Sequence, residues 1–258
     1  MNAQKAKIKP MGLGRSVIFF GIPGLILYSF IYYGVPYMNS INVPLIVSFP
    51  LALYGFLGML FFASLIGYKL EGNPNTLEGL KKRFRLQRMN WKMWLMALGT
   101  FILISLLEGL LSFTSIILAS ISIFSPPSIL PTFIDPFIEL TFPFKEFMGT
   151  PLFGNWWIIC LWFICLLCNI LGEEFWWRGY ILPRQELVFG DKAWIVNGFL
   201  WLFLFHAFLK WNYIVLMPTC FIIPYLAQKK KSTWLAVVIH GIGNAMFFIF
   251  IIPGVFSV

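Results

Sequence analysis

Long apolar segments separated by short polar ones make up most of this chain. Continuous apolar runs of this kind disfavour a transmembrane barrel, whose strands alternate between apolar and polar residues. A hydrocarbon core of about 30 Å needs about 20 apolar residues in helical form. The pattern therefore predicts an all-α, polytopic transmembrane bundle of about seven spans (six to eight), at roughly 16–38, 41–68, 93–124, 156–183, 193–209, 212–228 and 232–252.

Prolines modify two of the predicted spans. Pro44 and Pro50 lie near the start of the second span, which we expect to be kinked or to begin late because proline removes a helical hydrogen bond. The third is longer than a bilayer requires and should end before Ser125. The first follows basic residues, as in a signal peptide, but its apolar run is too long and no cleavage site follows, so we expect an uncleaved span.

The composition agrees with a membrane protein. Of 258 residues, 59% are hydrophobic and 11% are charged, whereas soluble domains carry about 25% charged residues. This balance excludes a soluble enzyme, a disordered chain and a disulfide-rich secreted module. The four cysteines all lie in apolar runs, where free cysteine behaves as a small hydrophobe, and we interpret them as packing residues.

Basic residues gather in alternate connecting segments. If the N-terminus is cytoplasmic, the cytoplasmic segments are 1–15, 69–92, 184–192 and 229–231, and together with Arg178 they hold 17 of the 19 Lys and Arg residues. The loop at 125–155 is net negative. This distribution obeys the positive-inside rule. The net charge of +9 is thereby explained without a nucleic-acid partner. We expect the lipid bilayer to surround the protein.

The basic stretch 81–88 and the tryptophans bear on how the chain meets the membrane surface. The basic stretch 81–88 is either an interfacial helix that touches anionic lipid or an ordinary cytoplasmic loop. Nine of the eleven tryptophans lie near predicted span ends, as expected for interfacial belts. Trp162 and Trp201 lie inside spans, and we assign them to packing.

The fourth predicted span ends in a cluster of charged residues. Placing an ionisable side chain inside a membrane span costs free energy, so we treat each such residue as a candidate functional residue. In a helix Glu174 and Arg178 share a face and can form an ion pair, while Glu173 points about 100° away. One carboxylate can then be structural and the other chemical. A salt-bridge cluster without chemistry is the alternative.

Both histidines of the chain also lie at span depth. His206 is in the fifth span, and His240 shares a helical face with Asn244 in the seventh. Counting 1.5 Å per residue from the inner span ends places both histidines and Glu173 between the inner half and the middle of the membrane. We expect them to form one site, the alternative being independent polar contacts between helices.

This set of side chains suggests amide hydrolysis. A Glu and a His can bind and deprotonate water, and a His and an Asn can donate hydrogen bonds to a developing oxyanion. Glu173, His206 and His240 are also a plausible zinc set with two nitrogens and one oxygen. Spacing does not choose between these two ways of activating water.

In combination, the motifs resemble those of the CPBP (CAAX protease and bacteriocin-processing, or Abi) family of intramembrane proteases, which includes type II CAAX prenyl endopeptidases. The resemblance rests on E-E-x-x-x-R at 173–178, a later apolar helix with a single His, and H-x-x-x-N at 240–244. It covers about 171–248. The family usually has F-x-x-x-H in the second motif, and Leu202 takes that Phe position here, which we regard as a packing difference.

The resemblance implies roles for the matching residues. Glu173 would be the general base, with His206 assisting, and His240 and Asn244 would form the oxyanion hole. Glu174 and Arg178 would support the first motif.

The resemblance also implies an organisation and a cofactor. A catalytic core at 156–258 would follow a basic cytoplasmic N-terminus at 1–15 and further spans and loops at 16–155. We favour water activated by glutamate without a cofactor. A divalent metal, zinc first, held by Glu173, His206 and His240, is the alternative.

We therefore expect an intramembrane endopeptidase in a bacterial cell membrane, with a site opening to the cytoplasmic half and a peptide or membrane-associated protein as substrate. The oligomeric state stays open. One alternative is a catalytically silent scaffold or bacteriocin-immunity protein of the same fold. Another is a transporter with Glu108 and the histidines as a proton relay. Glu108 can pair with a histidine, line the cavity or lie near an interface, and we do not assign it to catalysis.

Overall fold

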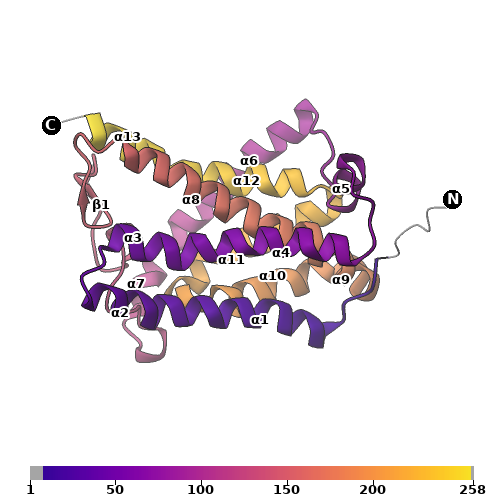
Figure 1. The fold of residues 1–258 in the computed structure, drawn as a ribbon, viewed down its shortest axis with the longest axis horizontal. Coiled ribbons are helices and arrows are strands. Elements are labelled where there is room, and N and C mark those ends of the chain that lie inside the picture. Colours follow the sequence, from indigo (N-terminus) through magenta and orange to yellow (C-terminus); the bar gives the residue numbers. More distant parts are fainter. Residues whose placement is uncertain (1–7, 257–258) are drawn as a thin grey trace.

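The computed structural model describes residues 8–256 and is almost entirely helical (Figure 1). Lys5 and Lys7 of the predicted basic N-terminus lie outside the described residues. Six helical stretches among the described residues are long and apolar enough to cross a membrane: Leu13–Ser40, Leu45–Leu70, Trp91–Leu111, Trp157–Phe203, Phe205–Lys230 and Thr233–Phe256. The predicted all-α polytopic bundle is confirmed.

The first three predicted spans begin and end close to the expected positions. The first contains α1 (Leu13–Ser29), the π-helical η1 (Phe30–Gly34) and α2 (Val35–Ser40). The second begins late, after Pro44, with α3 (Leu45–Pro50), the π-helical η2 (Leu51–Gly55) and α4 (Phe56–Leu70). The third contains α6 (Trp91–Leu111) and α7 (Phe113–Ala119), and ends before Ser125 as predicted.

The fourth and fifth predicted spans form one helical stretch of 47 residues. It contains α8 (Trp157–Glu173), the π-helical η5 (Glu174–Ile181), α9 (Leu182–Phe189), the 3-10 turn η6 (Gly190–Lys192) and α10 (Ala193–Phe203). Gly190 has φ 53°, a left-handed conformation that suits glycine, and the chain turns there. Within residues 8–256, about seven helical segments therefore run along the bundle, and two of them belong to the same continuous stretch.

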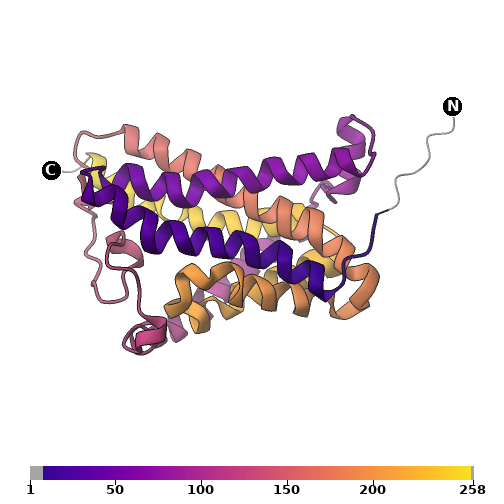
Figure 2. The ribbon, with the colours of Figure 1, turned by 60° about the horizontal axis from the view of Figure 1, so that its bottom comes forward.

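The last segments pack as hairpins. The 3-10 segment η7 (Phe205–Asn212) connects α10 to α11 (Tyr213–Lys230). These two helices approach closely because Gly198 lacks a Cβ, which would lie 2.5 Å from the Cys220 carbonyl oxygen. Figure 2 shows this pair (orange) at the bottom of the view, below α1. The chain ends with α12 (Thr233–Ala245) and α13 (Phe248–Phe256).

Three of the basic segments meet at one end of the bundle, which we call the basic end. There the Thr233 N–H donates to the Arg85 carbonyl oxygen over 3.1 Å, and the Met11 N–H donates to the Arg184 carbonyl oxygen over 3.0 Å. The stretch 81–88 begins in the last turn of α5 (Leu77–Arg83), and its remaining residues, 84–88, form a turn and a loop. Arg83 at the end of this helix is buried.

The opposite end carries residues 125–155, and we call it the loop end (Figure 1). These residues include the 3-10 turn η4 (Thr132–Ile134) and a two-stranded antiparallel hairpin of β1 (Glu146–Phe147) and β2 (Thr150–Pro151). A further 3-10 turn, η3 (Ser122–Phe124), precedes them. Trp162 packs here against Phe133, Phe147 and Phe247, which confirms its assignment to packing.

Candidate active site

The first motif lies where α8 passes into η5, in the middle of the bundle. Gly172 brings α8 against α4, because a Cβ at this position would lie 2.1 Å from the Leu57 carbonyl oxygen. Glu173 and Glu174 are buried as a result, at 4% and 0% exposure. The π-helical turns of η5 were not expected from the sequence. Such turns inside α-helices are frequent at functional sites.

Glu174 and Arg178 form the predicted ion pair. Arg178 Nε lies 3.4 Å from Glu174 Oε2, and both side chains are fully buried. Among the described residues, no side-chain nitrogen of Arg178 has a hydrogen-bond partner. Its guanidinium instead lies 3.5 Å from the centre of the Trp201 ring. The charge is thus balanced by one carboxylate and one aromatic face.

Glu173 takes no part in this ion pair and contacts Trp201 instead. The Trp201 Nε1–H donates to Glu173 Oε2 over 2.7 Å. Trp201 is therefore more than the packing residue we expected, and that assignment was incomplete. An indole N–H donates only, so this contact fixes one oxygen of the carboxylate as an acceptor.

His206 lies at the start of η7, where the backbone departs from helical geometry. Its Nδ1 lies 3.1 Å from the Trp201 carbonyl oxygen. Because a carbonyl can only accept, Nδ1 carries the hydrogen of this contact, and in the neutral ring Nε2 is an acceptor. Trp201 thus orients both Glu173 and His206.

His240 has a carboxylate partner that spacing alone did not indicate. Its Nδ1 lies 2.9 Å from Glu174 Oε1. Glu174 therefore bridges Arg178 and His240, two residues on different helices. A carboxylate on one ring nitrogen fixes the orientation of the imidazole and leaves Nε2 for another partner.

Asn244 is held on both sides of its amide. Its Nδ2 donates to the His240 carbonyl oxygen over 3.2 Å, and its Oδ1 accepts from Asn169 Nδ2 over 3.2 Å. We did not single out Asn169 from the sequence. Its position four residues before Glu173 on the same helical face, inside an apolar run, was the available signal.

One cavity of about 590 Å³ brings the predicted catalytic residues together. Glu173, His206, His240 and Asn244 all line it, as do Trp201 and Asn169. Glu174 and Arg178 lie behind this wall, buried and outside the lining. Glu108 lines the cavity too and accepts a hydrogen bond from Thr219 Oγ1 over 2.6 Å.

A metal centre does not follow from this arrangement. Within residues 8–256, no three His, Cys, Asp or Glu side chains are grouped so that they could hold a metal ion. His240 Nδ1 is engaged with Glu174, and Glu173 Oε2 accepts a hydrogen bond from Trp201. Glu173, His206 and His240 are thus not grouped as metal ligands among the described residues.

A membrane-helix bundle with a carboxylate, two imidazoles and an amide around one cavity has the features of an intramembrane hydrolase. Residues 155–246 match the family model described as type II CAAX prenyl endopeptidase Rce1-like. The match covers about a third of the chain, includes all six motif residues, and confirms the family resemblance. No curated protein and no solved structure was found to match the chain.

Proposed function

We propose that this protein is an intramembrane endopeptidase that hydrolyses a peptide bond with a water activated by Glu173 and His206. Its substrate is a peptide or a membrane-associated protein, and its location is a bacterial cell membrane. The observation that carries the proposal is the shared cavity of Glu173, His206, His240 and Asn244. The family match supports proteolysis as the class of reaction.

Glu173 is the general base of the proposed mechanism. Trp201 engages Oε2, so the other oxygen is the one that takes a proton from water. Nε2 of His206 accepts a hydrogen bond from the second hydrogen of the same water and orients it. The water oxygen then attacks the carbonyl carbon of the scissile bond.

His240 and Asn244 stabilise the oxyanion that this attack creates. His240 Nε2 and Asn244 Nδ2 donate to it, and the Glu174 carboxylate is the counter-ion of the imidazolium that this role requires. Glu173 then returns its proton to the leaving amine as the carbon–nitrogen bond breaks. The proton that Glu173 removes from water is thus the one that it gives to the leaving amine, and the proposed reaction requires no cofactor.

Cleavage of a peptide library in detergent tests this proposal. The wild type and Glu173→Gln are compared, each with and without a chelator. We expect cleavage that resists the chelator and is lost in Glu173→Gln. Glu108→Gln, which changes another carboxyl group in the same cavity, is the matched control and should keep measurable cleavage.

Two results would contradict the proposal. Cleavage that a chelator abolishes and zinc restores would replace the glutamate mechanism with a metal-dependent one. Full cellular function in both Glu173→Ala and His206→Ala would favour the non-catalytic scaffold or immunity protein.

A further inference from the structure

Glu108, on the α6 wall of the catalytic cavity, carries a carboxylate that the proposed mechanism does not use. Its Oε1 accepts the hydrogen bond from Thr219 Oγ1 of α11. Its Oε2 has no hydrogen-bond partner within residues 8–256. An ionised carboxylate can accept hydrogen bonds on both oxygens, so Glu108 still has an acceptor for a donor that enters the cavity.

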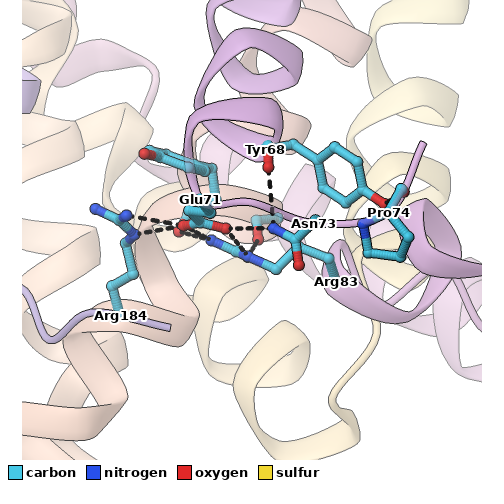
Figure 3. A network of polar contacts seen from close by, with 8 residues as sticks. Tyr68, Glu71, Asn73, Pro74, Arg83 and Arg184 are labelled. Carbon is cyan, nitrogen blue, oxygen red and sulfur yellow. Dashed lines mark hydrogen bonds and ion pairs between the residues drawn. The ribbon is translucent and has the colours of Figure 1, made fainter. Parts of the chain in front are cut away.

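Other carboxylates that lie between the helices are paired with basic side chains. Glu71 accepts from Arg83 Nε over 2.6 Å and from Arg184 Nη2 over 2.8 Å (Figure 3). Glu186 accepts from Arg85 Nη1 over 2.6 Å. None of the ion pairs formed within residues 8–256 includes a carboxylate of the cavity wall.

The basic side chains on or next to the catalytic elements are engaged elsewhere. Arg178 of η5 pairs with Glu174 behind the wall. Lys210 of η7 places its Nζ 4.8 Å from the centre of the Tyr32 ring. No Lys or Arg among the described residues lines the cavity. Within residues 8–256, therefore, no basic side chain pairs with Glu108.

The carboxylates around the cavity outnumber the cationic groups. With Glu108 ionised, three carboxylates lie in the wall or directly behind it, the others being Glu173 and Glu174. Two cationic groups face them, Arg178 and a protonated His240, and Glu174 pairs with both. The charges of Glu108 and His240 also interact, but one positive charge is still missing. An ionised carboxylate without a counter-charge is costly in apolar surroundings, so a cation that enters the cavity would stabilise this wall.

The wall around Glu108 combines oxygen acceptors with apolar side chains. Ser105, three residues earlier on the same face of α6, lines the cavity together with Thr219. The neighbouring lining residues Ile104 of α6 and Leu216 of α11 are apolar, and the two helices pack against each other. An ammonium group has three donors, and a long basic side chain packs its carbon stem on apolar surface while its charged end finds a partner. The wall suits both parts of such a side chain.

We propose that Glu108 is a specificity-determining residue that binds a positively charged nitrogen of the substrate, either in a Lys or Arg side chain or in a free α-amino group. That the bound cation belongs to a substrate rests on the proposed function. Hydrogen bonds between two charged groups are stronger than those between neutral ones. A peptide with Lys should therefore bind more tightly than the same peptide with norleucine, which has the carbon stem of Lys without its charge.

Binding of short peptides in detergent tests this subsite without requiring catalysis. The protein is Glu173→Gln, which removes the proposed base and also the other carboxylate of the cavity wall. Three fluorescent peptides share one Ala- and Leu-rich sequence. The first has blocked ends and a central Lys, the second has blocked ends and a central norleucine, and the third has norleucine and a free α-amino group. Fluorescence anisotropy gives the Kd of each.

We expect at least one of the two cationic peptides to bind about 10- to 100-fold more tightly than the blocked norleucine peptide. The peptide that shows this preference identifies the source of the cation. Adding Glu108→Gln should remove the preference, and Glu108→Asp, which keeps the charge on a shorter stem, should retain part of it. Glu139→Gln, an exposed position outside the cavity, is the matched control and should keep the full preference. The Tm of each variant in detergent reports whether it is folded.

Three outcomes would overturn the proposal. Equal affinity of Glu173→Gln for all three peptides would mean that the cavity does not select a cation, whatever the fate of the Glu108 variants. A preference that survives Glu108→Gln would place the cation at another group. Equal weakening for all three peptides, with a lower Tm, would make the contact between Glu108 and Thr219 a structural link between α6 and α11.

The binding result can be separated from the proposed function. Because Glu173→Gln lacks the proposed base, a wild type that cleaves no peptide would contradict proteolysis and still leave the binding preference measurable. If the wild type does cleave the library, Glu108→Gln should retain cleavage but cut peptides with cationic groups less often than the wild type does.

Discussion

Trp201 donates a hydrogen bond from Nε1 to Glu173 Oε2 over 2.7 Å while its carbonyl oxygen lies 3.1 Å from His206 Nδ1. One residue therefore orients both groups to which we assign the activation of water. It also presents its ring to the buried Arg178 guanidinium. An apolar-looking tryptophan in the middle of a span is thus the connection between the first and second motifs.

Trp201→Phe should lower kcat and leave KM nearly unchanged. The substitution keeps an aromatic ring but removes the donor to the carboxylate. Hydrogen bonds to charged groups contribute about 1.5–3 kcal/mol, so kcat should fall by about 10- to 100-fold. Steady-state kinetics on a cleaved peptide measures the effect.

Trp162→Phe is the matched control for this variant. Trp162 lines the same cavity, and its Nε1 has no hydrogen-bond partner among the described residues. It should change kcat much less than Trp201→Phe does. Equal losses in the two variants would mean that Trp201 acts only through packing.

Glu174→Gln should destabilise the protein and inactivate it together. The substitution removes the counter-ion of the fully buried Arg178 and the partner of His240. Removing one member of a buried ion pair costs about 3–5 kcal/mol. A lower Tm in detergent and loss of cleavage are the expected results.

A double substitution separates the two effects. Glu174→Gln combined with Arg178→Met removes both buried charges, and should recover part of the lost Tm because no unpaired charge remains. Activity should stay low, because His240 still lacks its carboxylate. Recovery of activity along with Tm would show that Glu174 serves stability alone.

Glu71 should make the basic end sensitive to acid. Burial by itself raises the pKa of this carboxyl group, but the hydrogen bonds and charges of Arg83 and Arg184 outweigh it, and the pKa is lowered below its ordinary value. A lowered folded-state pKa gives stability that is complete above the ordinary pKa of about 4.5 and is lost as the pH falls through the folded-state value.

The Tm should therefore decrease as the pH is lowered below that ordinary pKa, and Glu71→Gln should show a smaller decrease over the same range. Thermal unfolding in detergent at a series of pH values measures this difference. Glu78→Gln on the exposed side of α5 is the control and should keep the wild-type dependence. An unchanged slope in Glu71→Gln would argue against the network in Figure 3 as a source of stability.

Asn169→Leu should weaken catalysis through Asn244. It keeps side-chain size but removes the donor to Asn244 Oδ1, so the amide that we assign to the oxyanion loses one of its two fixed contacts. A neutral hydrogen bond contributes about 0.5–1.5 kcal/mol, so kcat should fall by up to about tenfold. Asn155→Ala, at the loop end, is the control, and a wild-type kcat in Asn169→Leu would exclude the positioning role.

The sequence by itself determined the class of fold, the approximate spans and the basic end of the bundle. These properties depend on local composition: apolar runs long enough to cross a bilayer, prolines that mark a late start, and basic residues in alternate loops. The six polar motif residues were also recognisable, because intramembrane polar groups are rare enough to stand out.

Only the tertiary structure decided how these residues are paired and that they line one cavity. Glu174 and His240 are 66 residues apart in sequence, and Asn169 and Asn244 are 75 apart, so no local pattern links them. Their contacts depend on how closely the helices approach, which glycines such as Gly172 and Gly198 permit. Spacing along one helix fixes the face of a side chain, but the partner on that face is set by the packing of another helix.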